Sequence, residues 1–439
     1  MKKIIFILIL SAVLLIGCSS SQMKEVDSPD SIPLSDAGNG AISASNSKLN
    51  FFGQLSFGRG TGAPNSNGFY YVQPQKNGYA NIMYIDYTTN SYLPLCSRPE
   101  CKHNDESCTS FLAWVGGYPL LMTNSKYLIM LKSNVGMEYG EKHGEAALAH
   151  IEVSDLNGSN RKTVITLAAN EDIQQQAACN DEFIYIVKSS IDEKMITTMS
   201  LCSISIATGE LKEIYQLPSG TSFLIGAEDE YITVKCYSNP EDGSLYSDHD
   251  TQTFLCVNIN TGACVSKNEL PFSRDAAPIQ TLVKGINLYL YYPEKDTIII
   301  KNMLTGQQTN QFDNILEQAI VDGQLVDLFD DRLILEEVFS TDNGEKISYL
   351  WFNLSTCEKG SCEMMGIYSG TQRTFPLVPS CMAYDKMLIV YQFHPENSMI
   401  EGPGGEMMEV QFFQKSFALI SPNDYFSEKP DFQQLQKAS

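Results

Sequence analysis

The feature that most constrains the fold of this chain is a repeated pair of strand signals joined by a hairpin turn. An apolar, β-rich run follows a small polar turn, a second apolar run comes next, and this run ends in a turn that contains Gly or Asn in most copies. Gly and Asn tolerate the positive φ angles that tight hairpins need. The hairpin turns fall at residues 85–90, 151–158, 204–209, 257–262, 301–306, 352–357 and 419–423, and Cys357 makes the sixth copy the weakest.

Each hairpin turn has a matching strand upstream. These strands are rich in aromatic and branched residues, and they fall at residues 69–72, 127–130, 183–187, 231–234, 288–291, 333–335 and 387–390. Short apolar patches before them, such as 120–122 and 223–225, supply a first strand, and the segment after each turn supplies a fourth.

Seven such units predict an all-β fold, a seven-bladed β-propeller with four antiparallel strands per blade. One blade cannot bury both faces of its sheet, so the blades stack around a ring and form one domain. A pair of β-sandwiches is the alternative, but it does not explain the repeated order of turns and strands. We expect no amphipathic helix after the N-terminal signal.

The first eighteen residues indicate where the protein works. A basic start, Lys2-Lys3, precedes an apolar run from Ile4 to Gly17. This run is shorter than the roughly 20 residues that a membrane-spanning helix needs, and its length is typical of a secretion signal. It ends in Leu15-Ile16-Gly17-Cys18, which resembles the lipobox of bacterial lipoproteins. The sequence therefore predicts a lipoprotein signal peptide at 1–17 and a lipid on Cys18, and hence a protein anchored to the cell membrane and facing outside.

Composition indicates how the rest of the chain is organised and which partners it excludes. Residues 18–48 are rich in Ser, Asp, Gly and Asn and contain no aromatic residue, which predicts a lipidated, disordered tether. The predicted propeller then occupies residues 49–439. The formal net charge of −22 argues against nucleic acid as a partner, because a phosphate backbone would find no basic surface. Twelve cysteines include Cys18, which leaves an odd number that cannot all pair internally.

One loop carries a dense set of chemically active residues. Cys96, Cys101, His103 and Cys108 lie within one short segment after the last predicted strand of the first blade, so we expect them in an inter-blade loop. Three cysteines and a histidine match the ligand set of a closed, structural zinc site. An extended stretch from Cys101 to His103 would project both side chains to one side, with Pro99 turning Cys96 back toward them. Two other interpretations remain open: a disulfide between two of the cysteines, or free thiols.

At this loop the chain resembles a group of surface lipoproteins of clostridia-type Gram-positive bacteria. Those proteins carry a lipobox, propeller-like repeats and a Cys-x-x-Pro-x-Cys-x-His loop followed by another cysteine, which Cys96, Pro99, Cys101, His103 and Cys108 match. The resemblance covers nearly the whole chain but implies no activity. The blades are also similar to those of the TolB-type propeller superfamily, a likeness of shape only.

Weaker candidates lie elsewhere. Cys357 and Cys362 flank a turn and form a disulfide if their Cα atoms come within about 7 Å, with free thiols as the alternative. Trp114 follows the cysteine loop and is either a platform for a ligand or the anchor of that loop.

The sequence favours a binding or interaction module for an unknown protein, peptide or glycan, with no catalytic residue assigned. The rival hypothesis is an envelope glycan-active hydrolase or lyase built on the same scaffold. Two carboxylates about 5–10 Å apart at the mouth of the central channel would favour this enzyme. A mouth lined by small or apolar residues would favour the binding module.

Overall fold

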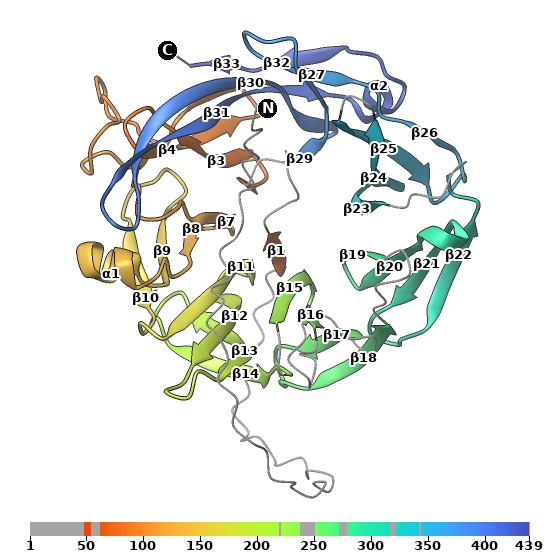
Figure 1. The fold of residues 1–439 in the computed structure, drawn as a ribbon, viewed down its shortest axis with the longest axis horizontal. Coiled ribbons are helices and arrows are strands. Elements are labelled where there is room, and N and C mark those ends of the chain that lie inside the picture. Colours follow the sequence, from red (N-terminus) through yellow and green to blue (C-terminus); the bar gives the residue numbers. More distant parts are fainter. Residues whose placement is uncertain are drawn as a thin grey trace, which may run out of the picture. The chain divides into compact units, whose positions relative to one another are not determined.

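The computed structural model describes residues 48–53, 62–218, 221–237, 251–271, 279–316, 322–341 and 344–438. The predicted signal peptide, Cys18 and nearly all of the predicted tether lie outside these ranges. The described residues belong to one compact unit. Their strands form seven sheets arranged as the blades of a propeller (Figure 1), which confirms the predicted fold and excludes the pair of sandwiches.

Each blade is built from consecutive antiparallel strands. The first blade contains β2 (Gly62–Pro64), β3 (Gly68–Pro74), β4 (Tyr79–Asp86) and β5 (Ser91–Pro94), and the second contains β7 (Leu120–Thr123), β8 (Tyr127–Lys132), β9 (His150–Asp155) and β10 (Lys162–Thr166). The third contains β11 (Glu171–Cys179), β12 (Phe183–Ile191), β13 (Thr197–Ser205) and β14 (Leu211–Gln216), and the fourth contains β15 (Thr221–Glu228), β16 (Tyr231–Tyr237), β17 (Thr251–Asn258) and β18 (Cys264–Pro271).

The remaining three blades follow the same pattern. The fifth contains β19 (Gln280–Lys284), β20 (Asn287–Tyr292), β21 (Thr297–Asn302) and β22 (Gln308–Asp313), and the sixth contains β23 (Asp322–Phe329), β24 (Arg332–Thr341), β25 (Gly344–Asn353) and β26 (Lys359–Ser361). The seventh contains β29 (Pro379–Ala383), β30 (Lys386–Glu401), β31 (Met407–Ile420) and β32 (Phe432–Gln434). A further hairpin of β27 (Met365–Tyr368) and β28 (Thr374–Pro376) joins the seventh sheet through a parallel pairing of β27 with β30.

The hydrophobic core lies between the blades. Second strands such as β8 are buried on both faces, because each sheet packs against the blades on either side. One cluster fills the spaces on both sides of the second blade, and a separate cluster fills the space between each later pair of neighbours. The last cluster joins the seventh blade to the first, through residues such as Phe417 and Tyr71.

Two terminal strands add to the blades. Strand β1 (Asn50–Gly53) pairs antiparallel with β11, the innermost strand of the third blade, and lies in the middle of the ring (Figure 1). Strand β33 (Gln436–Lys437) pairs parallel with β5 at the outer edge of the first blade. The C-terminal residues therefore link the last blade to the first.

The expectation that no helix follows the signal was wrong in two places. Helix α1 (Met137–His143) continues into a 3₁₀ turn (Gly144–Ala147) between β8 and β9, and helix α2 (Pro422–Phe426) replaces the expected last hairpin turn. The Ser421 side chain accepts a hydrogen bond from the Asp424 N–H and caps α2, while Tyr425 and Phe426 are buried. Another 3₁₀ turn (Pro293–Lys295) lies between β20 and β21.

Candidate metal centre and binding surfaces

The cysteine loop is inserted into the outer strand of the first blade. Strand β6 (Phe111–Ala113), which follows the loop, pairs with the same strand, β4, as β5 does. Ile82 on β4 bonds to the residues on both sides of the inserted loop: its carbonyl accepts from the Leu95 N–H, and its own N–H donates to the Ser110 carbonyl. The expectation of a loop between blades was therefore wrong: the outer strand leaves the sheet after Leu95 and resumes at Ser110.

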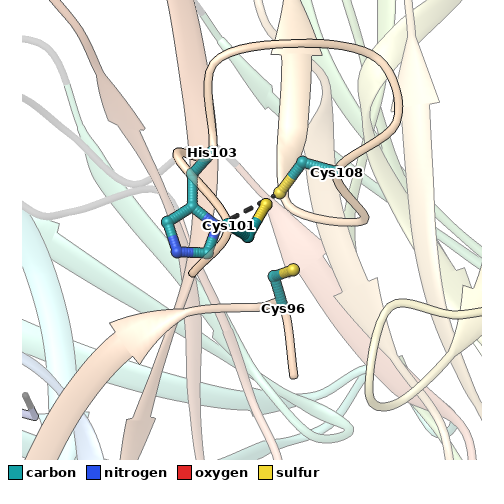
Figure 2. A group of neighbouring side chains, drawn as sticks. All are labelled: Cys96, Cys101, His103 and Cys108. Atoms are coloured by element: carbon teal, nitrogen blue, oxygen red, sulfur yellow. Dashed lines mark hydrogen bonds between the residues drawn. The ribbon is translucent and has the colours of Figure 1, made fainter. Parts of the chain in front are cut away.

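The four predicted ligands converge. One donor atom from each of Cys96, Cys101, His103 and Cys108 lies within 4.8 Å of all the others (Figure 2). The Nδ1 atom of His103 is 3.2 Å from the sulfur of Cys108. A tetrahedral zinc with bonds of about 2.0–2.3 Å places its ligand atoms about 3.3–3.8 Å apart, so the widest pair has to close by about 1 Å. The geometry thus fits one shared metal ion.

Tight turns produce this convergence. Glu100 and His103 have φ angles of 58° and 55°, and the Cys101 N–H donates to the Arg98 carbonyl at 3.4 Å. The chain therefore turns directly before Cys101 and again at His103, whose positive φ angle is not that of an extended backbone.

Arg98 provides positive charge beside the sulfurs. Its guanidinium lies 3.2 Å from the sulfur of Cys101 and 3.2 Å from the hydroxyl of Ser107. Burial raises the pKa of Cys96, but hydrogen bonds from the backbone and side chain of Arg98 outweigh it and lower this pKa to about 6. Burial raises the pKa of Cys108. The form of cysteine that binds metals is the thiolate, so the Arg98 guanidinium favours the form that a metal needs.

The loop is fixed to the blades at both of its sides. The Asn81 side-chain amide donates to the His103 carbonyl at 2.8 Å and to the Ser110 hydroxyl at 3.1 Å. Arg161 of the second blade donates to the Thr109 carbonyl at 2.6 Å and to the Phe111 carbonyl at 2.9 Å. These bonds place the candidate ligands before any metal binds.

Trp114 contacts a long arm of the seventh blade. This arm is the outer part of the β30–β31 hairpin, which extends along the first blade (Figure 1). The Trp114 indole N–H donates to the Glu401 carbonyl at 3.1 Å, and its ring meets those of Tyr118 and Phe412 edge-on. These contacts favour an anchoring role for Trp114, although the segment that it holds is the arm.

Every cysteine among the described residues is a free thiol in the structure. Cys357 is exposed and has a φ angle of 60°, whereas Cys362 is buried. Burial raises the pKa of Cys362 to about 12, so this thiol is held in its protonated form.

One mouth of the central channel contains a cavity of about 800 Å³, which no sequence motif indicated. Its walls come from β1, from the turns that join the first two strands of the first and second blades, and from the ends of β15 and β19; they include Lys48, Ser66, Ser125, Glu228 and Lys284. Several of its polar side chains are already bonded to the protein. The Asn65 and Asn124 side-chain oxygens accept from backbone N–H groups of their own turns, and Lys284 donates to Asp327.

No helix of the described residues is both long and apolar enough to cross a membrane. No family model and no curated protein matches the chain. Among solved structures, oligogalacturonate lyase from Vibrio parahaemolyticus is 11% identical with a TM-score of 0.46, and the match covers 88% of this chain and 97% of that one. The β-propeller domain of the trilobed protease from Pyrococcus furiosus is 10% identical with a TM-score of 0.42, and the match covers 85% and 93% of the two chains. At this level, the matches concern the fold alone.

Proposed function

We propose that the protein is a lipid-anchored, extracytoplasmic propeller that binds a ligand at the channel mouth. The observation that carries this proposal is the lining of the mouth. Among the described lining residues Glu228 is the single carboxylate, and its Oε2 atom accepts from the Ile286 N–H at 2.8 Å. A hydrolase acting on glycans uses a pair of carboxylates, so this lining supports binding over the rival hydrolase. The ligand class is an exposed glycan, peptide or protein segment.

A binding screen with the full chain tests this function. Envelope glycans and peptides are the probes, and Ser66→Trp and Ser125→Trp fill the mouth. We expect both variants to lose binding, whereas Thr163→Trp on the exposed strand β10 should retain it. Turnover of a glycan that disappears in Glu228→Gln would overturn the proposal in favour of the enzyme, and binding unaffected by both mouth variants would move the site elsewhere.

Membrane attachment is the second part of the proposal. The Leu15-Ile16-Gly17-Cys18 motif supports lipidation of Cys18, and a diacylglyceryl group supplies the two chains that stable anchoring takes. Lys48, which lies two residues before β1, lines the mouth, so a tether would leave from the face that carries the cavity. Mass spectrometry of the native N-terminus should find a lipidated Cys18; an unmodified N-terminus elsewhere would disprove the anchor.

The metal centre has a structural role in this proposal. A zinc ion bound by Cys96, Cys101, His103 and Cys108 would have four protein ligands and no open position for a substrate. It would stabilise the inserted loop and would not act as a catalyst.

A further inference from the structure

A second cavity, of about 280 Å³, lies between the first and second blades, beside the cysteine loop. Its volume is at the small end of the range for ligand pockets, which suits a small metabolite. Phe111 and Val115, from the segment after the cysteine loop, form an apolar part of its lining, and Met130, Lys132 and Glu152 line it from the second blade. Glu106 of the cysteine loop lies at its edge.

The two charged side chains lie on one face of the second blade. Lys132 on β8 is directly opposite His150 on β9, and Met130 is directly opposite Glu152. Residues two apart on a strand share a face. Lys132 and Glu152 are therefore diagonal neighbours, and both line the cavity.

These opposite charges do not pair. Both side chains are half-buried, and neither makes a hydrogen bond or an ion pair within 4.0 Å with any residue that the structure describes. Burial lowers the pKa of Lys132 to about 8, while the charge of Glu152 raises it. Half-burying two charges without a direct hydrogen bond or ion pair costs free energy, and a ligand that carries both complementary charges reduces this cost.

Two other polar side chains of the cavity, those of Arg161 and His150, make their hydrogen bonds to backbone carbonyls and not to Lys132 or Glu152. Arg161 directs both terminal nitrogens to the Thr109 and Phe111 carbonyls, and its buried Nε has no partner among the described residues. The Nδ1 atom of His150 lies 2.7 Å from the Leu148 carbonyl, which can only accept, so this nitrogen carries the proton. Lys132 is thus the ammonium with free donors in the cavity, and Glu152 is its carboxylate counterpart.

We propose that this cavity binds a small zwitterion, a free α-amino acid with an apolar side chain, independently of the channel mouth. The ligand carboxylate would meet the Lys132 ammonium, the ligand ammonium would meet the Glu152 carboxylate, and the apolar side chain would pack against Phe111, Val115 and Met130. The cysteine loop supplies one edge of the site through Glu106.

Calorimetric titration of the full chain with L-leucine tests the proposal. Two analogues each lack one charge: 4-methylpentanoate has no ammonium, and 3-methylbutylamine has no carboxylate. Because a hydrogen bond to a charged group contributes about 1.5–3 kcal/mol, each analogue should bind about tenfold or more weakly than leucine. Analogues that bind as tightly as leucine, or the absence of leucine binding at millimolar concentration, would overturn the proposal.

Variants assign the two charges separately. Lys132→Met should weaken leucine about tenfold or more and leave 3-methylbutylamine unchanged, whereas Glu152→Gln should weaken leucine and leave 4-methylpentanoate unchanged. Lys162→Met and Glu145→Gln are matched controls, because both residues are exposed and neither lines the cavity. Unchanged leucine affinity in a folded Lys132→Met protein would overturn the proposal, and if a variant does not fold, the analogue comparison still decides it.

Discussion

At the scale of single residues, the cysteines of the loop differ in their burial and in their distance from a positive charge. Cys108 is 3% exposed and belongs to the packed interior of the blade, whereas Cys96 and Cys101 are partly exposed and close to the Arg98 guanidinium. Cys101 is not one of the buried core residues, so a substitution there reports on metal binding with little effect on the core.

We expect Cys101→Ser to abolish stoichiometric zinc and to lower the melting temperature. A structural zinc contributes to folding free energy directly, because the unfolded chain has no preformed site. Metal analysis of anaerobically purified protein and thermal unfolding provide the measurements, with Cys357→Ser as a control at an exposed thiol. Wild-type protein without zinc and an unchanged melting temperature in Cys101→Ser would show that the four residues form an ordinary loop.

Cys357 occupies a position where other blades have glycine. Its N–H donates to the Asn353 carbonyl as the Gly262 N–H does to that of Asn258, and its φ angle of 60° resembles the 67° of Gly306. A side chain in this conformation costs about 1–2 kcal/mol. Cys357→Gly should therefore raise the free energy of unfolding by about 0.5–1 kcal/mol, after subtraction of the greater unfolded-state freedom of glycine.

The reciprocal change is the control for this prediction. Gly306→Ala has room for the added methyl group, since its nearest neighbour would be 3.9 Å away, so only the backbone conformation opposes it. Denaturant unfolding should show stabilisation in Cys357→Gly and destabilisation in Gly306→Ala. Changes of the same sign in both variants would contradict this account of the repeated turn.

Glu171 should make stability depend on pH. Burial raises the pKa of its carboxyl, but the hydrogen bond and charge of Lys188 outweigh it, so the pKa lies below its usual value of 4.5. A carboxyl with a depressed pKa stabilises the folded state above this value, and the stabilisation is lost as the pH falls through the folded-state pKa.

Glu171→Gln should cost roughly 1–3 kcal/mol at pH 7, and the difference from wild type should shrink as the pH falls below 4.5. Denaturant titrations at a series of pH values measure it, and Glu213→Gln on the exposed outer strand of the same blade is the control. A difference that stays constant down to pH 3 would exclude ionisation of Glu171 as the cause.

At the scale of elements, the β30–β31 arm is the largest departure from a regular blade. It contacts the first blade through Ser398, whose hydroxyl accepts from the Gly78 N–H at 3.1 Å and donates to the Gln75 carbonyl at 2.9 Å. Farther along, the Glu401 carbonyl accepts from Trp114 and Tyr139, and its side chain pairs with Lys142. The arm therefore connects the seventh, first and second blades.

Ser398→Ala should destabilise the arm by about 1–3 kcal/mol, because it removes the hydroxyl that bonds the half-buried Gly78 N–H and Gln75 carbonyl. Ser398 is 3% exposed, so water cannot readily replace the hydroxyl. Hydrogen exchange should show faster exchange at the Gly78 amide, while Ser125→Ala at an exposed turn leaves this amide unchanged. Unchanged protection in Ser398→Ala would mean that other contacts alone hold the arm.

At the scale of the whole molecule, ring closure depends on the last residues of the chain. Leu435 is 6% exposed, packs between the seventh and first blades, and donates its N–H to the Phe417 carbonyl at 3.0 Å. It lies directly before β33, the strand that pairs with the first blade. The same interface thus contains both the buried side chain and the closing strand.

Leu435→Ala should lower the free energy of unfolding by about 2–5 kcal/mol, because it removes buried methyl groups and leaves a cavity. We expect a single unfolding transition that moves to lower denaturant concentration, since every blade depends on its neighbours. Gln434→Ala, at an exposed neighbour, should have little effect. Two separate transitions in Leu435→Ala would show that the ring opens without global unfolding.

The sequence alone determined the features that short segments encode. Alternating apolar residues, together with turns of Gly, Asn and Asp, indicated seven four-stranded units, and the segment from Cys96 to Cys108 contained all four candidate ligands. These signals are local, because strand alternation and turn chemistry depend on neighbouring residues. The same local signals missed helix α2, whose Ser-Pro-Asn start also reads as a turn.

Only the tertiary structure decided how distant segments meet. It placed β1 in the channel, resumed the outer strand of the first blade at β6, brought Ser398 to Gly78, and set Lys132 and Glu152 facing Phe111 across a cavity. Such contacts join residues far apart in the chain, and their geometry follows from sheet register and from many weak packing contacts added over the ring. No short segment contains all of these contacts, so no sequence motif predicts the resulting arrangement.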